Sequence, residues 1–256
     1  MRRGLVPSRE QARAAIAAGH VTVAGAPADK PARLVGPGDP VVVVRPASRF
    51  VSRGGEKLDA ALDHFAVDVT GLRVLDAGAS TGGFTDCVLQ RGAASVVAVD
   101  VGYGQLHERL RADPRVDVRE RVNVRHLGPD ELEPVDLVVA DLSFISLRTV
   151  AAGLLGAAKP GADLVLLVKP QFEAGREAAD RGQGVIRDPR VRAEAVAAVA
   201  DHLRSLGATI MGVMVSPLRG AGGNVELLLH AVAAGGGPRT GVDDDALRAV
   251  VLAADP

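Results

Sequence analysis

The stretch Leu72–Thr85 constrains the fold of this chain more than any other. It reads LRVLDAGASTGGFT: an apolar run ends at Asp76, glycines stand at Gly78, Gly82 and Gly83, and a helical pattern follows. This order predicts a strand, a tight loop and a helix N-terminus, where small residues and backbone N–H groups let a nucleotide-like ligand approach closely. We therefore expect a sheet whose ligand loop lies directly after its first strand.

Length and composition narrow the class of protein. With 256 residues, of which 47% are hydrophobic and only 2% aromatic, the chain can form one large domain and a small one with a core of Ala, Val and Leu. The single Cys87 excludes a disulfide framework and fits a reducing compartment. No apolar run approaches the roughly 18 residues of a membrane helix, and the N-terminus is polar where a signal peptide is apolar. We expect a soluble, cytoplasmic, monomeric protein with no membrane partner.

Charge is distributed unevenly along the chain. Residues 1–53 contain nine basic and three acidic residues, a net charge of +6, whereas the whole chain carries −1. A basic N-terminal part on an acidic body indicates a polyanionic partner for that part. Only four basic residues are Lys, at positions 30, 57, 159 and 169. Because Arg stays protonated, a Lys in such an Arg-rich chain is expected where its pKa has to be adjustable.

The first 46 residues predict a small α+β domain. A helix over Ser8–Ala18, a strand within His20–Gly25 and a strand over Val41–Val44 follow from capping, alternation and turn residues. This pattern resembles the S4 RNA-binding module, through Arg3-Gly4-Leu5, Ser8-Arg9, Ala12, Ile16, Gly19–Val23 and Gly25. The module begins with one more helix than this sequence holds, so we expect a domain that is truncated at its start or, as we favour, a true start further upstream. The resemblance implies RNA contacts for Arg2, Arg3, Arg9, Arg13, Arg49 and Arg53.

Residues 47–53 are expected to be a linker, and residues 54–256 a second domain. Strands are predicted at Ser95–Val99, Val116–Arg119, Val135–Ala140, Leu164–Val168, Ala208–Ser216 and Asn224–His230, with helices between many of them. Strands that alternate with helices indicate a Rossmann-like α/β sheet. The Gly-rich loop Gln171–Asp188 is long enough to be a lid or a substrate loop.

An adenosine ligand is indicated by the loop together with Asp100, because an acid at the end of the second strand often binds ribose hydroxyls. A dinucleotide loop has the pattern G-x-G-x-x-G, and a Walker loop has a Lys-Ser/Thr pair; this loop has neither. Its Asp76-x-Gly78-x-x-x-Gly82-Gly83-Phe84 pattern resembles instead the S-adenosylmethionine loop of Rossmann-like methyltransferases. A dehydrogenase is the weaker interpretation.

Charged residues cluster at the predicted strand ends. Asp141 and Lys169 each follow a strand directly, Lys57 lies at the start of a helix beside the first strand, and Glu226 precedes the last strand. Ligands bind at the carboxyl ends of parallel strands, and an antiparallel last strand would bring Glu226 to the same edge. Ion pairs without function are the alternative explanation for such a set.

These four residues match the Lys-Asp-Lys-Glu tetrad of FtsJ-like 2′-O-ribose methyltransferases, and the chain resembles the TlyA family within them. The blocks that carry the resemblance are Val51–Gly54 with Lys57, Leu75–Thr85, Asp100–Leu106, Val139–Ser146, Leu167–Glu173 and Gly223–Glu226. TlyA proteins methylate cytidine in ribosomal RNA and are also labelled hemolysins. The resemblance implies large-subunit RNA as substrate and, for a long family member, small-subunit RNA as well.

The resemblance also assigns roles. Lys57, Asp141, Lys169 and Glu226 would be catalytic, with Lys169 acting on the 2′-hydroxyl as a cation or as a base. S-adenosylmethionine would lie on Asp76, Gly78, Ala79, Ser80, Gly82, Gly83, Phe84, Asp100, Val101, Asn123 and Asp141. No metal is expected, because the six His show no ligand spacing, and Ser143 and Ser146 lack the G-x-S-x-G frame of a hydrolase. A non-catalytic ribosome-assembly factor and a membrane-active hemolysin remain the alternatives from other classes.

Overall fold

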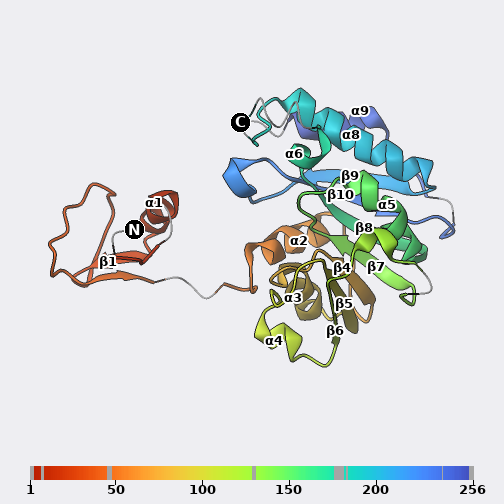
Figure 1. The fold of residues 1–256 in the computed structure, drawn as a ribbon. Helices are drawn as coiled ribbons and strands as arrows, with labels where there is room; N and C mark the ends of the chain where they lie inside the picture. Colours follow the sequence, from red (N-terminus) through yellow and green to blue (C-terminus); the bar gives the residue numbers. More distant parts are fainter. Residues whose placement is uncertain are drawn as a thin grey trace. The chain divides into compact units, whose positions relative to one another are not determined.

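The computed structural model describes residues 3–6, 9–44, 48–128, 131–175, 182, 184–237 and 239–253 (Figure 1). Contacts between residues divide the chain into two compact units, Met1–Arg49 and Phe50–Pro256. Arg2, the expected helix cap Ser8, the linker residues 45–47 and much of the loop Gln171–Asp188 lie outside the described residues.

The first unit is a helix on a three-stranded antiparallel sheet. Its elements are α1 (Arg9–Ala17), β1 (Val21–Val23), β2 (Ala26–Pro27) and β3 (Val41–Val43), with the strand order β2-β1-β3. Ala24 and Gly25 both have positive φ and connect β1 to β2 by a two-residue turn. The small core contains Val21, Val23 and Ala28, against which Ile16 of α1 packs. The predicted α+β arrangement is therefore confirmed.

The second unit is built on a seven-stranded sheet of order β6-β5-β4-β7-β8-β10-β9. The strands are β4 (Arg73–Ala77), β5 (Ser95–Asp100), β6 (Val116–Glu120), β7 (Val135–Ala140), β8 (Ala158–Val168), β9 (Thr209–Val215) and β10 (Leu227–Val232). The helices are α2 (Arg53–His64), α3 (Gly83–Gln90), α4 (Glu108–Arg111), α5 (Leu147–Gly156), α6 (Pro170–Glu173), α8 (Pro189–Ser205) and α9 (Asp244–Leu252), with short 3-10 turns η1 (Val124–His126) and η2 (Ala221–Gly223).

Helices cover both faces of this sheet (Figure 1). Neighbouring residues of one strand point to opposite faces: Val74 of β4 packs with α2 and α3, and Leu75 packs with α5 and α8. The central strands are therefore apolar at nearly every position, as in a sheet that is buried on both sides. The free Cys87 of α3 is buried in this core, as expected.

Strand direction decides which residues meet at the ligand edge. β4, β5, β6, β7 and β8 run parallel, whereas β10 is antiparallel to both of its neighbours, β8 and β9. The start of β10 therefore lies at the carboxyl edge of the parallel strands, as the sequence predicted. The α/β fold class is confirmed.

Two predicted strand starts differ from the structure by more than one residue. β10 begins at Leu227 rather than at Asn224, because the Asn224 side chain binds the backbone of another loop: it accepts from Ile186 N at 3.0 Å and donates to Gly184 O at 2.8 Å. β8 begins six residues earlier than expected, at Ala158, and includes polar and proline residues that carry no strand signal. Both differences leave the carboxyl edge of the sheet unchanged.

Candidate functional site

The turn after β4 is the centre of the site. Gly78 N and Ala79 N donate to Val99 O of β5 at 2.8 and 3.1 Å, which fixes the chain as it leaves the strand. Gly78 has a φ of 84°, and a Cβ there would lie 2.6 Å from Asp141 O, so neither its conformation nor its surroundings admit a side chain. Ser80 also has positive φ, and its N–H donates to the Asp100 carboxylate at 2.8 Å. The turn is held from both neighbouring strands.

Asp76 lies behind this turn and is fully buried. One carboxylate oxygen accepts from Thr85 N at 2.9 Å and from Thr85 Oγ1 at 2.6 Å, and thereby joins the end of β4 to the first turn of α3. Burial raises the pKa of Asp76 to about 7, an effect that the two Thr85 hydrogen bonds oppose. Asp76 does not belong to the described walls of the three cavities that surround the turn, and it supports the turn through Thr85. Its contact with the cofactor stays a prediction.

The last two glycines of the loop also serve packing. A Cβ on Gly83 would lie 2.3 Å from Ser52 Oγ and 2.9 Å from Gly55 N, so this glycine lets α3 approach the start of α2. A Cβ on Gly82, whose φ is 95°, would lie 2.3 Å from a methyl group of Leu110. Of the two, only Gly83 lines a cavity of the described structure. Gly82 and Gly83 therefore allow neighbouring helices to pack closely against the loop, and Gly83 also borders a cavity.

Three adjoining cavities surround the loop. The Asp100 cavity, of about 630 Å³, is lined by Gly78, Ser80, Val99, Asp100, Val101, Gly102, Gln105, Val122, Asn123, Val124, Asp141, Leu142, Ser143, Phe144 and Ile145. The glycine-loop cavity, of about 170 Å³, is lined by Ser52, Gly54, Gly78, Ala79, Ser80, Thr81, Gly83, Phe84, Asp141, Ser143 and Lys169. The lysine cavity, of about 490 Å³, is lined by Arg53, Lys57, Ser143, Phe144, Lys169, Gln171, Phe172, Gly184, Arg219, Gly220, Asn224 and Glu226.

The Asp100 cavity has the size and chemistry of a nucleoside site. The Asp100 carboxylate is fixed by two backbone donors, Ser80 N at 2.8 Å and Gly102 N at 2.6 Å. Two of the predicted ligand residues, Val101 and Asn123, lie in the same wall. Among the described lining residues there are two carboxylates and no Lys or Arg. Such a wall suits an uncharged or cationic nucleoside better than one that carries phosphates.

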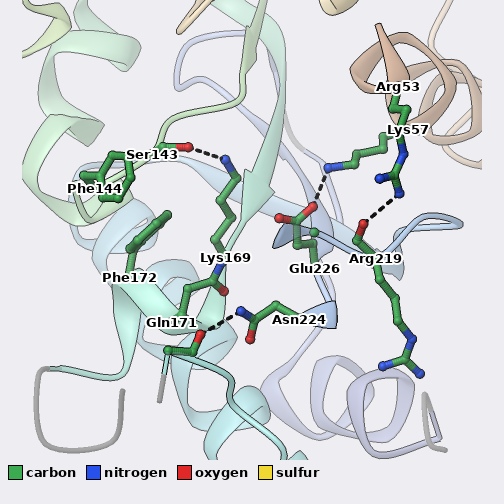
Figure 2. Close-up of a pocket in the computed structure, with 12 residues that line it drawn as sticks. Arg53, Lys57, Ser143, Phe144, Lys169, Gln171, Phe172, Arg219, Asn224 and Glu226 are labelled. Atoms are coloured by element: carbon green, nitrogen blue, oxygen red, sulfur yellow. Dashed lines mark hydrogen bonds and ion pairs between the residues drawn. The ribbon is translucent and has the colours of Figure 1, made fainter. Parts of the chain in front are cut away.

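Two ion pairs lie at the lysine cavity, and Figure 2 shows one of them, between Lys57 and Glu226. Lys169 Nζ forms an ion pair with Asp141 Oδ1 at 2.6 Å and donates a hydrogen bond of 2.8 Å to Ser143 Oγ. Lys57 Nζ lies 2.5 Å from Glu226 Oε2. Lys57, Lys169 and Glu226 line this cavity, while Asp141 faces the two cavities next to it. The structure thus brings all four residues of the predicted tetrad to one place.

The ion pair between Lys57 and Glu226 is buried beneath the surrounding chain. Lys57 lies in the first turns of α2 and is 8% exposed, and Glu226, directly before β10, is 3% exposed. Gly220 closes over the carboxylate, since a Cβ there would lie 2.0 Å from Glu226 Oε1. Glu226 O also accepts from Ser216 N at 2.9 Å, which fixes its backbone. The carboxylate has little freedom to leave its lysine.

Sequence reasoning missed several residues of the site. Ser143 was considered only as a hydrolase nucleophile, yet it is a partner of Lys169. Phe144 is 91% exposed with a φ of 64°, and its ring lies 5.3 Å from that of Phe172 at the mouth of the lysine cavity. An aromatic residue three positions after the predicted site residue Asp141, in a chain with few aromatic residues, was the available signal. Asn224, a link to the loop at Gly184, carried no signal in the sequence.

The arginines predicted to bind RNA have different surroundings. Arg9, Arg13, Arg49 and Arg53 are exposed. Arg9 and Arg13 are four residues apart on α1, so they share one face of this helix. Arg3 is exposed as well, but its guanidinium donates to backbone carbonyls of its own unit, Gly36 O at 2.6 Å, Pro37 O at 3.0 Å and Asp39 O. Arg53 donates to Arg219 O at 3.0 Å beside the lysine cavity.

Within the described ranges, no group of three or more His, Cys, Asp or Glu side chains could hold a metal ion. In that part of the chain, none of the helices is long and apolar enough to cross a membrane.

Comparison with known proteins gives two family matches. The family described as FtsJ-like methyltransferase matches residues 50–232, and the S4 domain matches residues 2–41. The chain is 55% identical over 231 residues to the 16S/23S rRNA (cytidine-2′-O)-methyltransferase TlyA of Mycobacterium tuberculosis, which covers 90% of this chain and 86% of the relative.

Two further relatives carry the hemolysin name. Hemolysin A of Brachyspira hyodysenteriae is 37% identical over 90% of this chain and 95% of its own length. A hemolysin-named structure from Streptococcus thermophilus superimposes with a TM-score of 0.79 at 37% identity and covers 98% of this chain and 91% of its own. The chain is therefore similar both to a protein named as an rRNA methyltransferase and to proteins named as hemolysins.

Proposed function

The chain belongs to the FtsJ-like methyltransferases and, within them, to the TlyA family, and on this premise we propose that it methylates cytidine 2′-hydroxyls of ribosomal RNA. S-adenosylmethionine is the proposed methyl donor. The observation that carries the proposal is the pairing of Lys169 with Asp141 at the border between the lysine cavity and the glycine-loop cavity. A side chain that can exchange a proton thereby lies between the places for a donor and for an acceptor.

The donor site is proposed from the walls of two cavities. Asp100, Val101 and Asn123 would hold the nucleoside half of the donor, and the turn at residues 78–84 its amino-acid half. The carboxylates and the scarcity of basic groups in these walls fit a cationic sulfonium nucleoside. When bound, the donor supplies an electrophilic methyl group. Asp76 would act indirectly, because it fixes the turn through Thr85.

The acceptor is a poor nucleophile, because a ribose hydroxyl has to lose its proton as the new bond forms. Lys169 is proposed to contact this hydroxyl and either to favour its ionisation as a cation or to take the proton as a neutral amine. Asp141 holds the amine in place at 2.6 Å. Lys57 and Glu226 would position the ribose from the opposite wall of the lysine cavity. Correct placement of the two reactants is itself a large part of the catalysis in such a transfer.

The polymer is proposed to be held by basic and aromatic groups. Arg53 and Arg219 line the lysine cavity and would contact phosphates, and the exposed Phe144 offers a face for a base. In the N-terminal unit, Arg9, Arg13 and Arg49 are the proposed RNA contacts. Both ribosomal subunits are proposed as substrates, since the relative from M. tuberculosis is named for 16S and 23S RNA.

The test is methylation of purified 30S and 50S subunits with radiolabelled S-adenosylmethionine. We expect label in both RNAs, on cytidines whose 3′ phosphodiester resists alkaline hydrolysis because the 2′-oxygen is blocked. Lys169→Arg keeps the charge but cannot act as a base, and Lys169→Ala removes both functions. Absence of label with the wild-type protein on either subunit contradicts the proposal, and binding of RNA without transfer then indicates an assembly factor. Full activity of both Lys169 variants contradicts the role of Lys169.

A further inference from the structure

Ser143 stands where the three cavities of the site meet. It lies on the loop between β7 and α5, and it is the only one of the described lining residues that belongs to all three cavity walls. Its hydroxyl oxygen accepts a hydrogen bond from Lys169 Nζ at 2.8 Å (Figure 2). Ser143, which lacks the G-x-S-x-G frame of a hydrolase nucleophile, is thus hydrogen-bonded directly to Lys169.

The geometry of the lysine amine gives this contact a consequence. Nζ has three tetrahedral positions besides its bond to Cε. Ser143 Oγ takes one of them at 2.8 Å, whereas Asp141 Oδ1 lies 2.6 Å from Nζ as an ion-pair partner without the angles of a hydrogen bond. The hydrogen bond to Ser143 sets the rotation of the amine about the Cε–Nζ bond, and thereby the directions of the other two positions. One of these two positions is left to exchange a proton with an acceptor.

The loop that carries Ser143 is anchored at both ends. At its start, Asp141 N donates to Ala77 O at 3.0 Å. At its end, the buried Glu173 accepts from Ser146 Oγ at 2.5 Å and from Leu147 N at 2.7 Å. Because Glu173 belongs to α6, which starts directly after Lys169, the loop and the lysine are held in one frame. The hydroxyl of Ser143 is therefore placed before any substrate binds.

We propose that Ser143 is a positioning residue for methyl transfer: it accepts one N–H of Lys169 and so directs another position of this amine toward the acceptor hydroxyl. The inference rests on the proposed function, in which Lys169 acts on a ribose 2′-hydroxyl. It extends that function by one residue outside the Lys-Asp-Lys-Glu set. Ser143 is not itself a nucleophile here, since its oxygen accepts from the lysine and no base withdraws its proton.

The test compares Ser143→Ala, Ser143→Cys and Ser143→Thr in the full chain, with 50S subunits and S-adenosylmethionine. Ala lacks the acceptor and Cys offers a weak one at similar size, so we expect kcat to fall roughly 10- to 100-fold in both. KM for the subunit and Kd for the donor should stay within about twofold, because neither is bound through this hydroxyl. Thr keeps the hydroxyl and should restore most of kcat.

A double variant separates positioning from a structural effect. If Ser143 acts through Lys169, Ser143→Ala should cause no further loss in a Lys169→Ala background. The matched control is Ser205→Ala, the same change at an exposed serine that donates to His202 O at the end of α8. It should leave all parameters unchanged, and thermal unfolding verifies that each variant is folded.

The outcomes distinguish the inference from the function on which it rests. A Ser143→Ala variant with wild-type kcat overturns the inference. Loss of activity in Lys169→Ala at the same time supports the proposed methyl transfer, so the two can be told apart. Equal loss in the Ala and Thr variants, or a loss that adds to that of Lys169→Ala, also overturns the inference. A wild-type protein that methylates neither subunit overturns both.

Discussion

Lys57 Nζ lies 2.5 Å from Glu226 Oε2, and 169 residues of chain separate the two. The lysine comes from α2 and the glutamate from the segment before the antiparallel β10, so the pair forms only when the whole sheet is assembled. Both side chains are removed from solvent except at the lysine cavity. A buried pair adds little net stability over apolar residues, but a single partner left behind is costly. Retention of such a pair at a cavity is consistent with a role in binding.

Replacement of one or both partners separates stability from function. Lys57→Met or Glu226→Met alone leaves a buried charge, and we expect the free energy of unfolding to fall by about 3–5 kcal/mol. The double variant should recover most of this loss, because two unbranched apolar chains replace the pair. All three should lose methyl transfer by roughly 100-fold or more. Urea unfolding and methylation of 50S subunits measure the two effects, and a double variant with normal activity would contradict a role of the pair in the reaction.

Asp76 should give the stability of the protein a distinct pH dependence. Its folded-state pKa is raised from 3.8 to about 7 by burial, so the folded protein holds a proton between these pH values that the unfolded chain has lost. The free energy of unfolding therefore falls as pH rises from about 4 to about 7, by at most about 4 kcal/mol from this group.

Asp76→Asn is the variant that isolates this effect. The amide oxygen can still accept from Thr85, while no charge has to be buried. We expect the variant to gain stability over the wild type, with a gain at pH 8 that exceeds the gain at pH 5. Urea unfolding at both pH values checks the expectation, and a gain that does not change with pH would show that Asp76 is not protonated in the folded state.

Strand ends made much of this site predictable from the sequence. Asp100, Asp141 and Lys169 each end or follow an apolar run, and parallel strands have to bring such residues to one edge. Glu226 required an antiparallel last strand, which the family resemblance supplied and β10 confirms. The local pattern of small residues was also enough to identify the turn that begins at Gly78.

The roles of residues that act through a contact with another element could not be predicted from the sequence. Ser143, Glu173 and Asn224 are polar residues in loops or in a four-residue helix, with no periodicity to assign them a partner. Their hydrogen bonds reach 26 to 40 residues along the chain. The hydrogen bonds of Asp76 to Thr85 likewise depend on the packing of α3 against the end of β4. Such relationships follow from the three-dimensional fold and carry no local sequence pattern.

Asp100 is expected to control donor affinity and not the transfer step. Its carboxylate is fixed by Ser80 N and Gly102 N in the Asp100 cavity. Removal by Asp100→Ala should weaken binding of S-adenosylmethionine about tenfold or more, the effect of losing hydrogen bonds to a charged group, while kcat at saturating donor changes little. Calorimetric titration measures the affinity. Asp117→Ala, the same change at an exposed residue of the neighbouring β6, is the control and should bind the donor normally.

Two glycines of α5 offer a test of how the η1 turn is positioned at the Asp100 cavity. Gly153 is buried, and a Cβ there would lie 2.2 Å from Val124 O, in the η1 turn whose Val124 lines the Asp100 cavity. Gly156, one turn later, is exposed, with Leu127 O at 3.9 Å from its Cβ position.

Gly153→Ala should therefore displace the η1 turn, because the obstacle is a backbone carbonyl that no rotamer change can remove. We expect a loss of roughly 1–3 kcal/mol in the free energy of unfolding and weaker donor binding. Gly156→Ala, with the same gain in helix propensity and no obstacle, should raise stability by up to about 1 kcal/mol and leave the donor affinity unchanged. Urea unfolding and calorimetric titration of both variants give the comparison. Unchanged donor affinity in a folded Gly153→Ala protein would show that the η1 turn does not contact the nucleoside, and the proposed contact of the nucleoside with Asn123 would have to be given up.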